Sequence, residues 1–287
     1  MSFRQAVHAA TGRLPAGSGE DRDAILVFLH IPKTAGSTLV SFLEREYGSG
    51  AVLDLYDSTF GDEATSLTPE RLRRTRVVVG HFYFGVHEHL PRPCRYLTFL
   101  RDPVDRVVSH YRFVQRQPEH YLHETASTLS LSEYVRSCGT AEPNNDQTRL
   151  LAGRKLASGD GGSSRAMLPV AKRNLDRHAV VGLTEAFDAS LLLMRRVFGW
   201  SRPFYVSRNI GDRREVVDPD TRGLILSHNE LDAELYRYGR ERFENEIREQ
   251  GAAFARELRA FRRLNRVYGK TRALVSASRA RRSPASA

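Results

Sequence analysis

The segment HIPKTAGST, residues 30–38, combines a lysine, a glycine and several hydroxyl side chains between an apolar run and a segment with helical spacing. A loop that leads from a buried strand into a helix presents free backbone N–H groups at the positive end of the helix dipole. Lys33 adds a mobile charge, Gly36 allows close backbone approach, and hydroxyl donors come from Thr34, Ser37 and Thr38. The loop predicts a phosphate or sulfate site. The alternative is a helix N-terminus capped by its own Ser and Thr, with Lys33 in solvent.

The order of residues in this loop argues against ATP. A phosphate loop for ATP and magnesium has the pattern G-x-x-x-x-G-K-[ST], in which the lysine follows the last glycine. Here Lys33 precedes Gly36 by three residues, and Asp102, which follows a later predicted strand, is typical of a helix cap. The pattern disfavours a magnesium-dependent kinase or NTPase.

A second candidate anion site lies in YLTFLRDPVDRVVSHYRF, residues 96–113. Arg101 follows a predicted strand, and Ser109 comes about two helical turns later, which returns it to nearly the same face. Arginine suits a phosphate held in fixed geometry, and ligands of such sheets bind at the carboxyl ends of the strands. Two anion sites after two strands fit a nucleotide with phosphate at both its 5′ and 3′ positions.

These motifs resemble those of sulfotransferases that use 3′-phosphoadenosine 5′-phosphosulfate (PAPS). PKTAGST looks like their 5′-phosphosulfate loop and TFLRDPVDRVVSHYRF like their 3′-phosphate motif. VVVGHF, NNDQTRLLAG and HNELDAELYRYG are similar to segments of the carbohydrate branch typified by heparan sulfate 2-O- and 6-O-sulfotransferases, so the resemblance covers residues 24–239. It implies an α/β fold with a P-loop-like, mostly parallel central sheet flanked by helices. Golgi members carry a membrane anchor; because we find none here, we expect a cytoplasmic, bacterial relative.

The resemblance also assigns roles to residues. It implies PAPS as donor, its desulfated product PAP, no metal, and a carbohydrate or glycosylated metabolite as acceptor. Lys33 would stabilise the departing bridging oxygen, Arg101 and Ser109 would hold the 3′-phosphate, and His81 would be the base. The 5′-phosphosulfate would be held by Lys33, Thr34, Ala35, Gly36, Ser37 and Thr38. An ATP-dependent, kinase-like phosphoryl transferase and a non-catalytic nucleotide- or polyanion-binding protein are the alternatives.

Other residues are candidates for acceptor and lid contacts. His87 and His89 are candidate acceptor contacts, with an ordinary surface position as the alternative. Asn145, Gln147 and Arg149 could contact acceptor or cofactor, or cap a helix. Candidate lid residues over the nucleotide are Arg208, Arg213 and Arg214. Trp200 is expected in the core, and Cys94 and Cys138 are expected to be reduced thiols because their spacing fits neither a metal site nor a disulfide framework.

The elements expected from the sequence alternate between strands and helices. Apolar runs predict strands over Ile25–Leu29, Arg76–Phe82, Cys94–Leu100 and His178–Glu185. Helical spacing predicts a helix after the first, the third and the fourth of these strands, and a long helix from Asn229. Further helices are predicted around Ser132–Cys138, Asn145–Ala152 and Arg165–Arg177. Residues 153–164 are glycine- and serine-rich and predict a flexible loop. Such alternation is typical of a parallel sheet covered on both faces.

The chain of 287 residues is expected to form one domain over residues 24–268, after a loose extension of residues 1–23. Its net charge is +10, and +9 of this lies from Gly251 onward, where ten basic residues face the single acid Glu257. We expect residues 269–287 to be a disordered basic tail, and the basic segment either to be solvated or to contact an anionic surface. No nucleic-acid-binding pattern and no membrane-spanning apolar run is evident.

Overall fold

The computed structural model describes residues 24–56, 68–138, 142–153, 164–201, 203–206 and 217–282. Its centre is a five-stranded parallel sheet of order β2-β3-β1-β4-β5. The strands are β1 (Ile25–Leu29), β2 (Val52–Asp54), β3 (Val77–Gly80), β4 (Cys94–Leu100) and β5 (Ala179–Leu183). The predicted parallel α/β architecture is confirmed.

The strands form where apolar runs are buried on both faces of the sheet. The residues of β1, β3 and β5 are all buried, and the predicted bounds of β1 and β4 are confirmed. The other two predicted strands are correct in place but shorter, since pairing stops before His81 and before Thr184. Strand β2 was not predicted, because three residues carry too little periodicity to detect.

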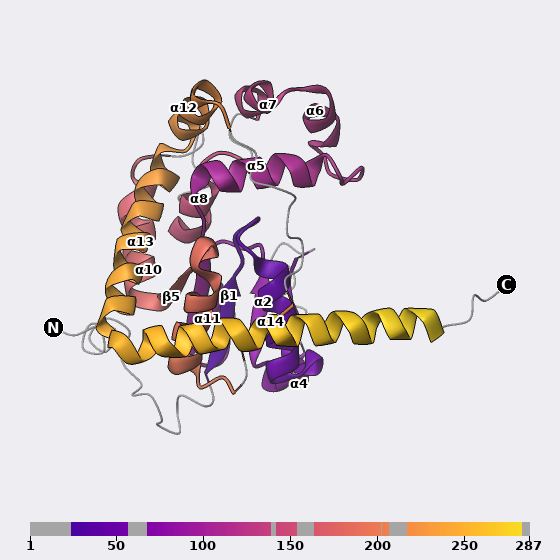
Figure 1. Cartoon of the computed structure of the whole chain (residues 1–287). Helices are drawn as coiled ribbons and strands as arrows, with labels where there is room; N and C mark the ends of the chain where they lie inside the picture. The colour runs from indigo at the N-terminus through magenta and orange to yellow at the C-terminus, as the bar shows by residue number, and fades with distance from the viewer. Residues whose placement is uncertain are drawn as a thin grey trace.

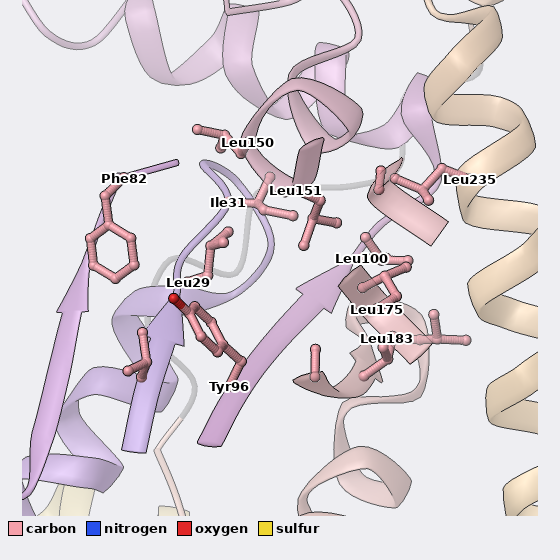
Figure 2. Close-up of a cluster of buried hydrophobic side chains, with 14 of the residues drawn as sticks. Leu29, Ile31, Phe82, Tyr96, Leu100, Leu150, Leu151, Leu175, Leu183 and Leu235 are labelled. Carbon is pink, nitrogen blue, oxygen red and sulfur yellow. The ribbon is translucent and has the colours of Figure 1, made fainter. Parts of the chain in front are cut away.

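Helices cover both faces of the sheet. On one face, α8 (Asp146–Ala152), α10 (Met167–His178) and α13 (Glu230–Glu249) bury leucines against alternate residues of β1, β4 and β5 (Figure 2). On the other face lie α2 (Gly36–Tyr47) and α11 (Phe187–Phe198), where Trp200 joins the core at 3% exposure, as predicted. Cys94 is half-buried and Cys138 buried, both as free thiols.

The order of the strands places a topological switch point beside β1, where parallel sheets bind ligands in a crevice. Strand β1 lies between β3 and β4, so the loops that follow these three strands leave the same edge side by side, at the point where the connections change direction. Helix α5 (Pro103–Val114) runs over this edge, and α6 (His123–Thr128), α7 (Leu131–Ser137) and α12 (Pro219–His228) form a cap with it (Figure 1). Asp102 caps α5 and Pro103 opens it, as predicted.

The remaining elements are short, apart from one. They are α4 (Pro69–Arg74) and the 3₁₀ turns η2 (Ser49–Ala51), η3 (Val86–His89) and η4 (Thr184–Ala186). The exception is α14 (Gly251–Arg282), which crosses the layer of α2 and α11 and continues past the rest of the fold (Figure 1). Among the described residues, no helix is both long and apolar enough to cross a membrane.

The C-terminal segment corrects one prediction. Residues 269–282 are helical, not a disordered tail, because Ala, Leu, Arg and Lys favour helix and no Pro or Gly lies between Gly269 and Arg282. The N-terminal extension and nearly all of the predicted glycine-rich loop lie outside the described residues, and the single-domain interpretation stays a prediction.

Candidate functional site

The loop after β1 has an unusual backbone. Lys33 and Ala35 lie in the left-handed region, with φ of 70° and 68°, on either side of Thr34. Side chains other than glycine adopt this region at an energetic cost, and such residues gather at binding sites. The N-cap residue of α2 is Ala35, whose side chain cannot cap the first turn. The N-cap position itself is thus not filled by a Ser or Thr, and the N–H groups at the start of α2 receive no cap from it.

Lys33 does not extend into solvent. Its Nζ lies 3.8 Å from the centre of the Phe113 ring on α5, so the side chain reaches from the loop to α5. Burial, with the nearby positive charges of Arg101 and Arg116, lowers the pKa of Lys33 to about 8, while the negative charge of Glu142 opposes this shift. A desolvated ammonium at a helix N-terminus interacts strongly with an anion.

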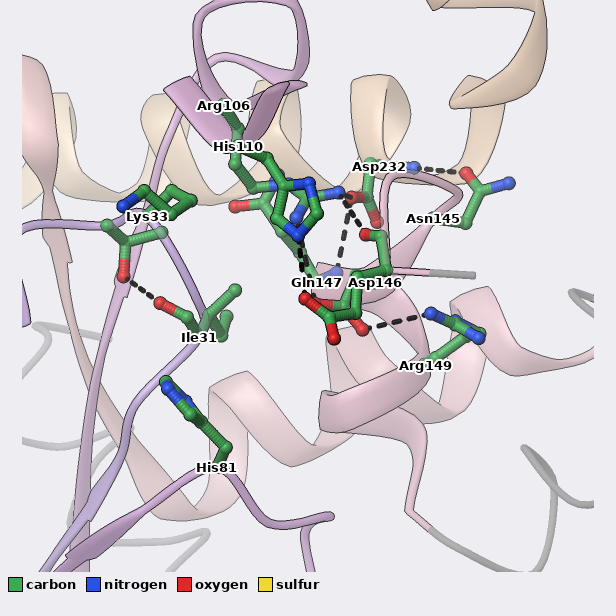
Figure 3. Close-up of polar contacts among 12 residues, drawn as sticks. Ile31, Lys33, His81, Arg106, His110, Asn145, Asp146, Gln147, Arg149 and Asp232 are labelled. Atoms are coloured by element: carbon green, nitrogen blue, oxygen red, sulfur yellow. Dashed lines mark hydrogen bonds and ion pairs between the residues drawn. The ribbon is translucent and has the colours of Figure 1, made fainter. Parts of the chain in front are cut away.

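Two residues of the loop have other roles than predicted. The hydroxyl of Thr34 is fully buried and donates to the carbonyl of Ile31 at 2.8 Å, so the hydroxyl part of its predicted ligand contact is wrong (Figure 3). At Gly36, a Cβ would lie only 1.7 Å from Nε2 of His30. The missing side chain therefore makes room for the His30 ring and not for a ligand. Ser37 is exposed at the first turn of α2.

His81 follows β3 and lies beside the loop, as predicted. Its Nδ1 is 2.7 Å from the carbonyl oxygen of His30. A carbonyl only accepts, so Nδ1 carries the proton and donates, and Nε2 keeps the lone pair that a general base needs. His81 reaches the surface, but its ring lies against those of His30 and Tyr56, with centroids 4.5 and 4.6 Å away. The resulting loss of hydration lowers the pKa of His81, although the hydrogen bond to the His30 carbonyl opposes this shift.

Two residues that were not predicted from the sequence, His30 and Tyr56, support His81. His30 is 8% exposed, and its Nδ1 lies 2.5 Å from the hydroxyl of Tyr56, which follows β2. Burial, then His81 and Lys33, lowers the pKa of His30, so the ring stays neutral. The register aligns Leu29 of β1 with Gly80 of β3, which sets these two histidines side by side. The contact between Tyr56 and His30 joins residues 26 apart, and no local pattern indicates it.

Arg101 is fixed on both sides. Its Nη1 donates to the carbonyl of Lys33 at 2.9 Å, which ties the end of β4 to the anion loop. Its backbone N–H donates to Oε1 of Gln147, and Nε2 of Gln147 donates to its carbonyl, both at 3.0 Å. The predicted meeting of the two anion motifs at one sheet edge is thus observed. Ser109 is half-buried on α5.

Asn145 and Gln147 point toward protein groups. Oδ1 of Asn145 accepts from the N–H groups of Leu231 and Asp232, and thus caps α13, whereas the carboxylate of Asp232 accepts from the N–H groups of Gln147 and Thr148 and caps α8 (Figure 3). These exchanged caps, and the full burial of Gln147, contradict the predicted acceptor contacts of Asn145 and Gln147 and support the capping alternative. Arg149 pairs with Asp146 at 3.0 Å.

The other candidates lie elsewhere. Nδ1 of His87 is 2.8 Å from the hydroxyl of Tyr96, which lies near the beginning of β4. The ring of His87 packs against His178, the residue before β5. His87 is therefore directed away from the carboxyl-edge crevice, contrary to its predicted acceptor role, because η3 returns the chain to the opposite end of the sheet. His89 is exposed on the same turn. The candidate lid residues Arg208, Arg213 and Arg214 lie outside the described residues.

Comparison with known proteins points to one family. The family model described as Galactose-3-O-sulfotransferase matches residues 4–281. Heparan-sulfate 6-O-sulfotransferase 1 of Homo sapiens is 28% identical over 275 residues, covering 77% of this chain and 66% of that protein. Heparan-sulfate 6-O-sulfotransferase 2 of Danio rerio is 31% identical over 276 residues, covering 77% and 58%. The chain thus spans less than two thirds of each of these relatives.

A solved structure, that of a sulfotransferase from Alicyclobacillus acidocaldarius, aligns with a TM-score of 0.39 at 18% identity, covering 74% of this chain and 94% of that one.

Proposed function

Since this chain belongs to the galactose-3-O-sulfotransferase family, we propose that it is an enzyme that transfers a sulfuryl group from PAPS to a hydroxyl of a carbohydrate acceptor. Two further expectations, a cytoplasmic location and a bacterial source, stay predictions.

One observation carries the proposal: the anion loop and an oriented histidine base are joined by a hydrogen bond. The left-handed loop places Ala35, which cannot cap, at the N-cap of α2, and the carbonyl of His30 in the same loop orients His81 at 2.7 Å. A donor anion held by the loop would lie beside Nε2 of His81. Transfer of a sulfuryl group needs this juxtaposition of leaving group and base.

The residues divide the work of an in-line transfer. Nε2 of His81 takes the proton of the acceptor hydroxyl, whose oxygen forms the new bond to sulfur while the bond from sulfur to the bridging oxygen breaks. Lys33 stabilises the charge left on that oxygen, and the N–H groups of the α2 first turn hold the phosphate that departs. Arg101 and Ser109 hold the 3′-phosphate at the end of β4. Divalent metal is not part of this proposal, which fits the fixed positive charges of Lys33 and Arg101.

The direct test is transfer of labelled sulfate from PAPS to a panel of glycosides and oligosaccharides. Thermal unfolding with PAP in the absence of magnesium is a separate measurement, since a ligand of the native state raises Tm. We expect a higher Tm with PAP and label in at least one sugar. A chain that neither binds PAP nor transfers sulfate would contradict the proposal.

The kinase-like alternative makes the opposite prediction. It requires ATP with magnesium to raise Tm more than PAP does, and phosphate rather than sulfate to reach the acceptor. The family match and the lysine placed before the glycine both favour the sulfotransferase.

The basic face of α14 supports a further part of the proposal, a polyanion-binding surface. Arg256, Arg259, Arg263, Arg266 and Lys270 follow one another at intervals of three and four residues, and all are exposed. Among the described side chains, none forms an ion pair or hydrogen bond with these five. At about 1.5 Å per residue the row is roughly 21 Å long, a length that suits an extended anionic chain. We call these five residues the basic ridge.

A further inference from the structure

The carboxylate of Glu142 lies in the crevice and has no role in the proposed transfer. Oε2 of Glu142 is 2.6 Å from Nε2 of His110 on α5. Its other oxygen, Oε1, is 3.9 Å from Nε2 of His120 and 3.4 Å from the hydroxyl of Tyr121. The Glu142 side chain keeps 34% of its surface exposed. Oε2 is thus anchored by a short hydrogen bond, whereas Oε1 makes only long contacts, and the side chain is partly exposed.

This carboxylate is adjacent to the proposed transfer site. Lys33 lies over the Phe113 ring, and the ring of Phe113 is 6.2 Å from that of His120, so a continuous row of contacts leads from the reacting lysine to Glu142. The negative charge of Glu142 also opposes the lowering of the pKa of both Lys33 and His81. In the view of Figure 3, His110 lies above His81.

Glu142 stays ionised in this position. Burial alone would raise its pKa, but the hydrogen bond and charge of His110, together with His120 and His81, outweigh burial and lower it. An ionised carboxylate beside the binding loop for an anionic donor costs electrostatic free energy unless it serves another ligand. A ligand of this carboxylate carries either hydrogen-bond donors or positive charge.

The aromatic neighbours point to the kind of ligand. The ring of Tyr121 stacks on that of His120, with centroids 4.8 Å apart, and Tyr121 is 68% exposed. A large exposed ring beside a few directed polar groups is typical of a surface that binds an amphipathic small molecule, because the ring covers apolar C–H groups while the polar groups fix orientation. A sugar offers both C–H faces and hydroxyl donors.

A metal ion is the competing occupant, since the ligand atoms of His110, His120 and Glu142 all lie within 4.8 Å of one another. The protons argue against it. The N–H of Leu122 donates to Nδ1 of His120 at 3.2 Å, so a neutral His120 carries its proton on Nε2, which faces Glu142. The 2.6 Å contact between Nε2 of His110 and the carboxylate likewise requires a proton between them. His120 therefore presents no lone pair to a metal at this place, and a metal at His110 would have to displace the proton that it shares with Glu142.

We propose that Glu142 and Tyr121, held by His110 and His120, form an acceptor subsite for the hydroxyl groups of a neutral sugar. The inference rests on the proposed function and adds a specificity to it: Glu142 accepts from the sugar hydroxyls and repels a uronate or sulfate at the same place, while Tyr121 covers the sugar ring. Glu142 and Tyr121 bind substrate; His110 and His120 position the carboxylate.

The test measures binding and turnover separately. In the PAP-loaded protein, binding of methyl β-galactoside is compared with binding of methyl β-glucuronide, an acidic sugar, for wild type, Glu142→Gln, Tyr121→Ala and the control Glu124→Gln, an exposed glutamate on α6. Kd for PAP and acceptor KM are measured on the same proteins. Removing one hydrogen bond to a charged group changes affinity by about tenfold or more.

We expect Glu142→Gln and Tyr121→Ala each to raise the galactoside Kd and the acceptor KM about tenfold, with no loss of PAP affinity and with the control equal to wild type. The preference of wild type for the galactoside over the glucuronide should fall in Glu142→Gln. Unchanged galactoside binding in both variants would overturn the inference, as would wild-type activity that is lost with a chelator and restored by zinc. Wild type that binds PAP but transfers sulfate to no acceptor would refute the proposed function itself.

Discussion

At the scale of single residues, the base assignment depends on which nitrogen of His81 carries the proton. Because Nδ1–H donates to the His30 carbonyl, His81→Ala should leave PAP affinity unchanged and lower kcat by about 10²–10⁴-fold, the contribution typical of a general base. Steady-state sulfate transfer and PAP titration measure the two quantities. His228→Ala on α12 is a control for loss of an imidazole. Full turnover in His81→Ala would remove this residue from the mechanism.

The pH profile should report two groups with shifted pKa values. His81 must be neutral, and its pKa is lowered, so activity should rise with pH along a limb below the ordinary histidine range. Lys33 must be protonated, and its pKa is about 8, so kcat/KM should fall as pH rises through that value. Bound donor adds negative charge beside Lys33 and raises its pKa, so the alkaline limb of kcat should lie higher than that of kcat/KM. Coincident alkaline limbs would contradict the role of Lys33.

Gly36 can be tested with a second glycine as control. In Gly36→Ala the new methyl would overlap the His30 ring, which cannot move without breaking its contact with Tyr56 and shifting the carbonyl that orients His81. We expect a loss of about 1–3 kcal/mol in the free energy of unfolding, as for overpacking, together with a fall in kcat. Gly50→Ala, where no atom lies within 4 Å of the added Cβ, should behave as wild type. Equal behaviour of the two variants would refute this role of Gly36.

The residues that the sequence predicted are those whose role depends on local order. Lys33, Arg101 and His81 each follow a strand, and a parallel sheet brings such residues to one edge. The roles of His30, Tyr56 and Glu142 depend instead on contacts between distant segments, such as Glu142 with His110, which lies 32 residues earlier. Nothing in the local pattern around these residues indicates their partners.

At the scale of elements, the bounds of the strands could be predicted from runs of apolar residues, whereas the short polar helices could not be predicted. Helices α4 and α6 were not predicted because six residues show little periodicity, and α12 was missed since its packing relies on Ile225 against α5 and α7. The capping of α8 and α13 was foreseen only as one alternative, because each cap comes from the other helix.

That exchange of caps should be the most sensitive point of the fold. Asp232→Ala removes the acceptor for two N–H groups of α8 and leaves Arg106, which is fully buried and 3.8 Å from Asp232, with less compensating charge. We expect a loss of about 3–5 kcal/mol in the free energy of unfolding, measured with urea. The control Thr68→Ala, an exposed cap of α4, should cost about 1 kcal/mol.

Asp232→Ala should also weaken PAP binding, since α8 carries Gln147, which fixes the backbone of Arg101. Equal destabilisation by Asp232→Ala and Thr68→Ala would show that the exchanged caps contribute no more than an ordinary one.

At the scale of the whole molecule, charge is separated from chemistry. The proposed transfer site lies under α5 at the carboxyl edge of the sheet, whereas most of the net charge lies on α14, which crosses the layer of α2 and α11 (Figure 1). The inner side of α14 is already paired, since Glu257 binds Arg195 and Arg196, and Arg262 binds Asp188. The basic ridge faces away from these pairs, so it is free to bind a partner without disturbing the fold.

Charge reversal on α14 tests this separation. In Arg259→Glu/Arg263→Glu/Arg266→Glu we expect binding to heparin, the probe of an extended polyanion, to fall at least tenfold, because three attractions become repulsions; the wild-type affinity itself should weaken steeply with salt. PAP affinity and transfer to a monosaccharide glycoside should not change, since the ridge lies outside the crevice. The triple variant of Arg173, Arg177 and Arg222 to Glu changes net charge equally at exposed positions on α10 and α12 and controls for charge alone. Equal loss of heparin binding in both variants would show that net charge alone causes the effect. If the wild type binds anionic vesicles but not heparin, the partner of the basic ridge is a membrane surface and not an extended polyanion.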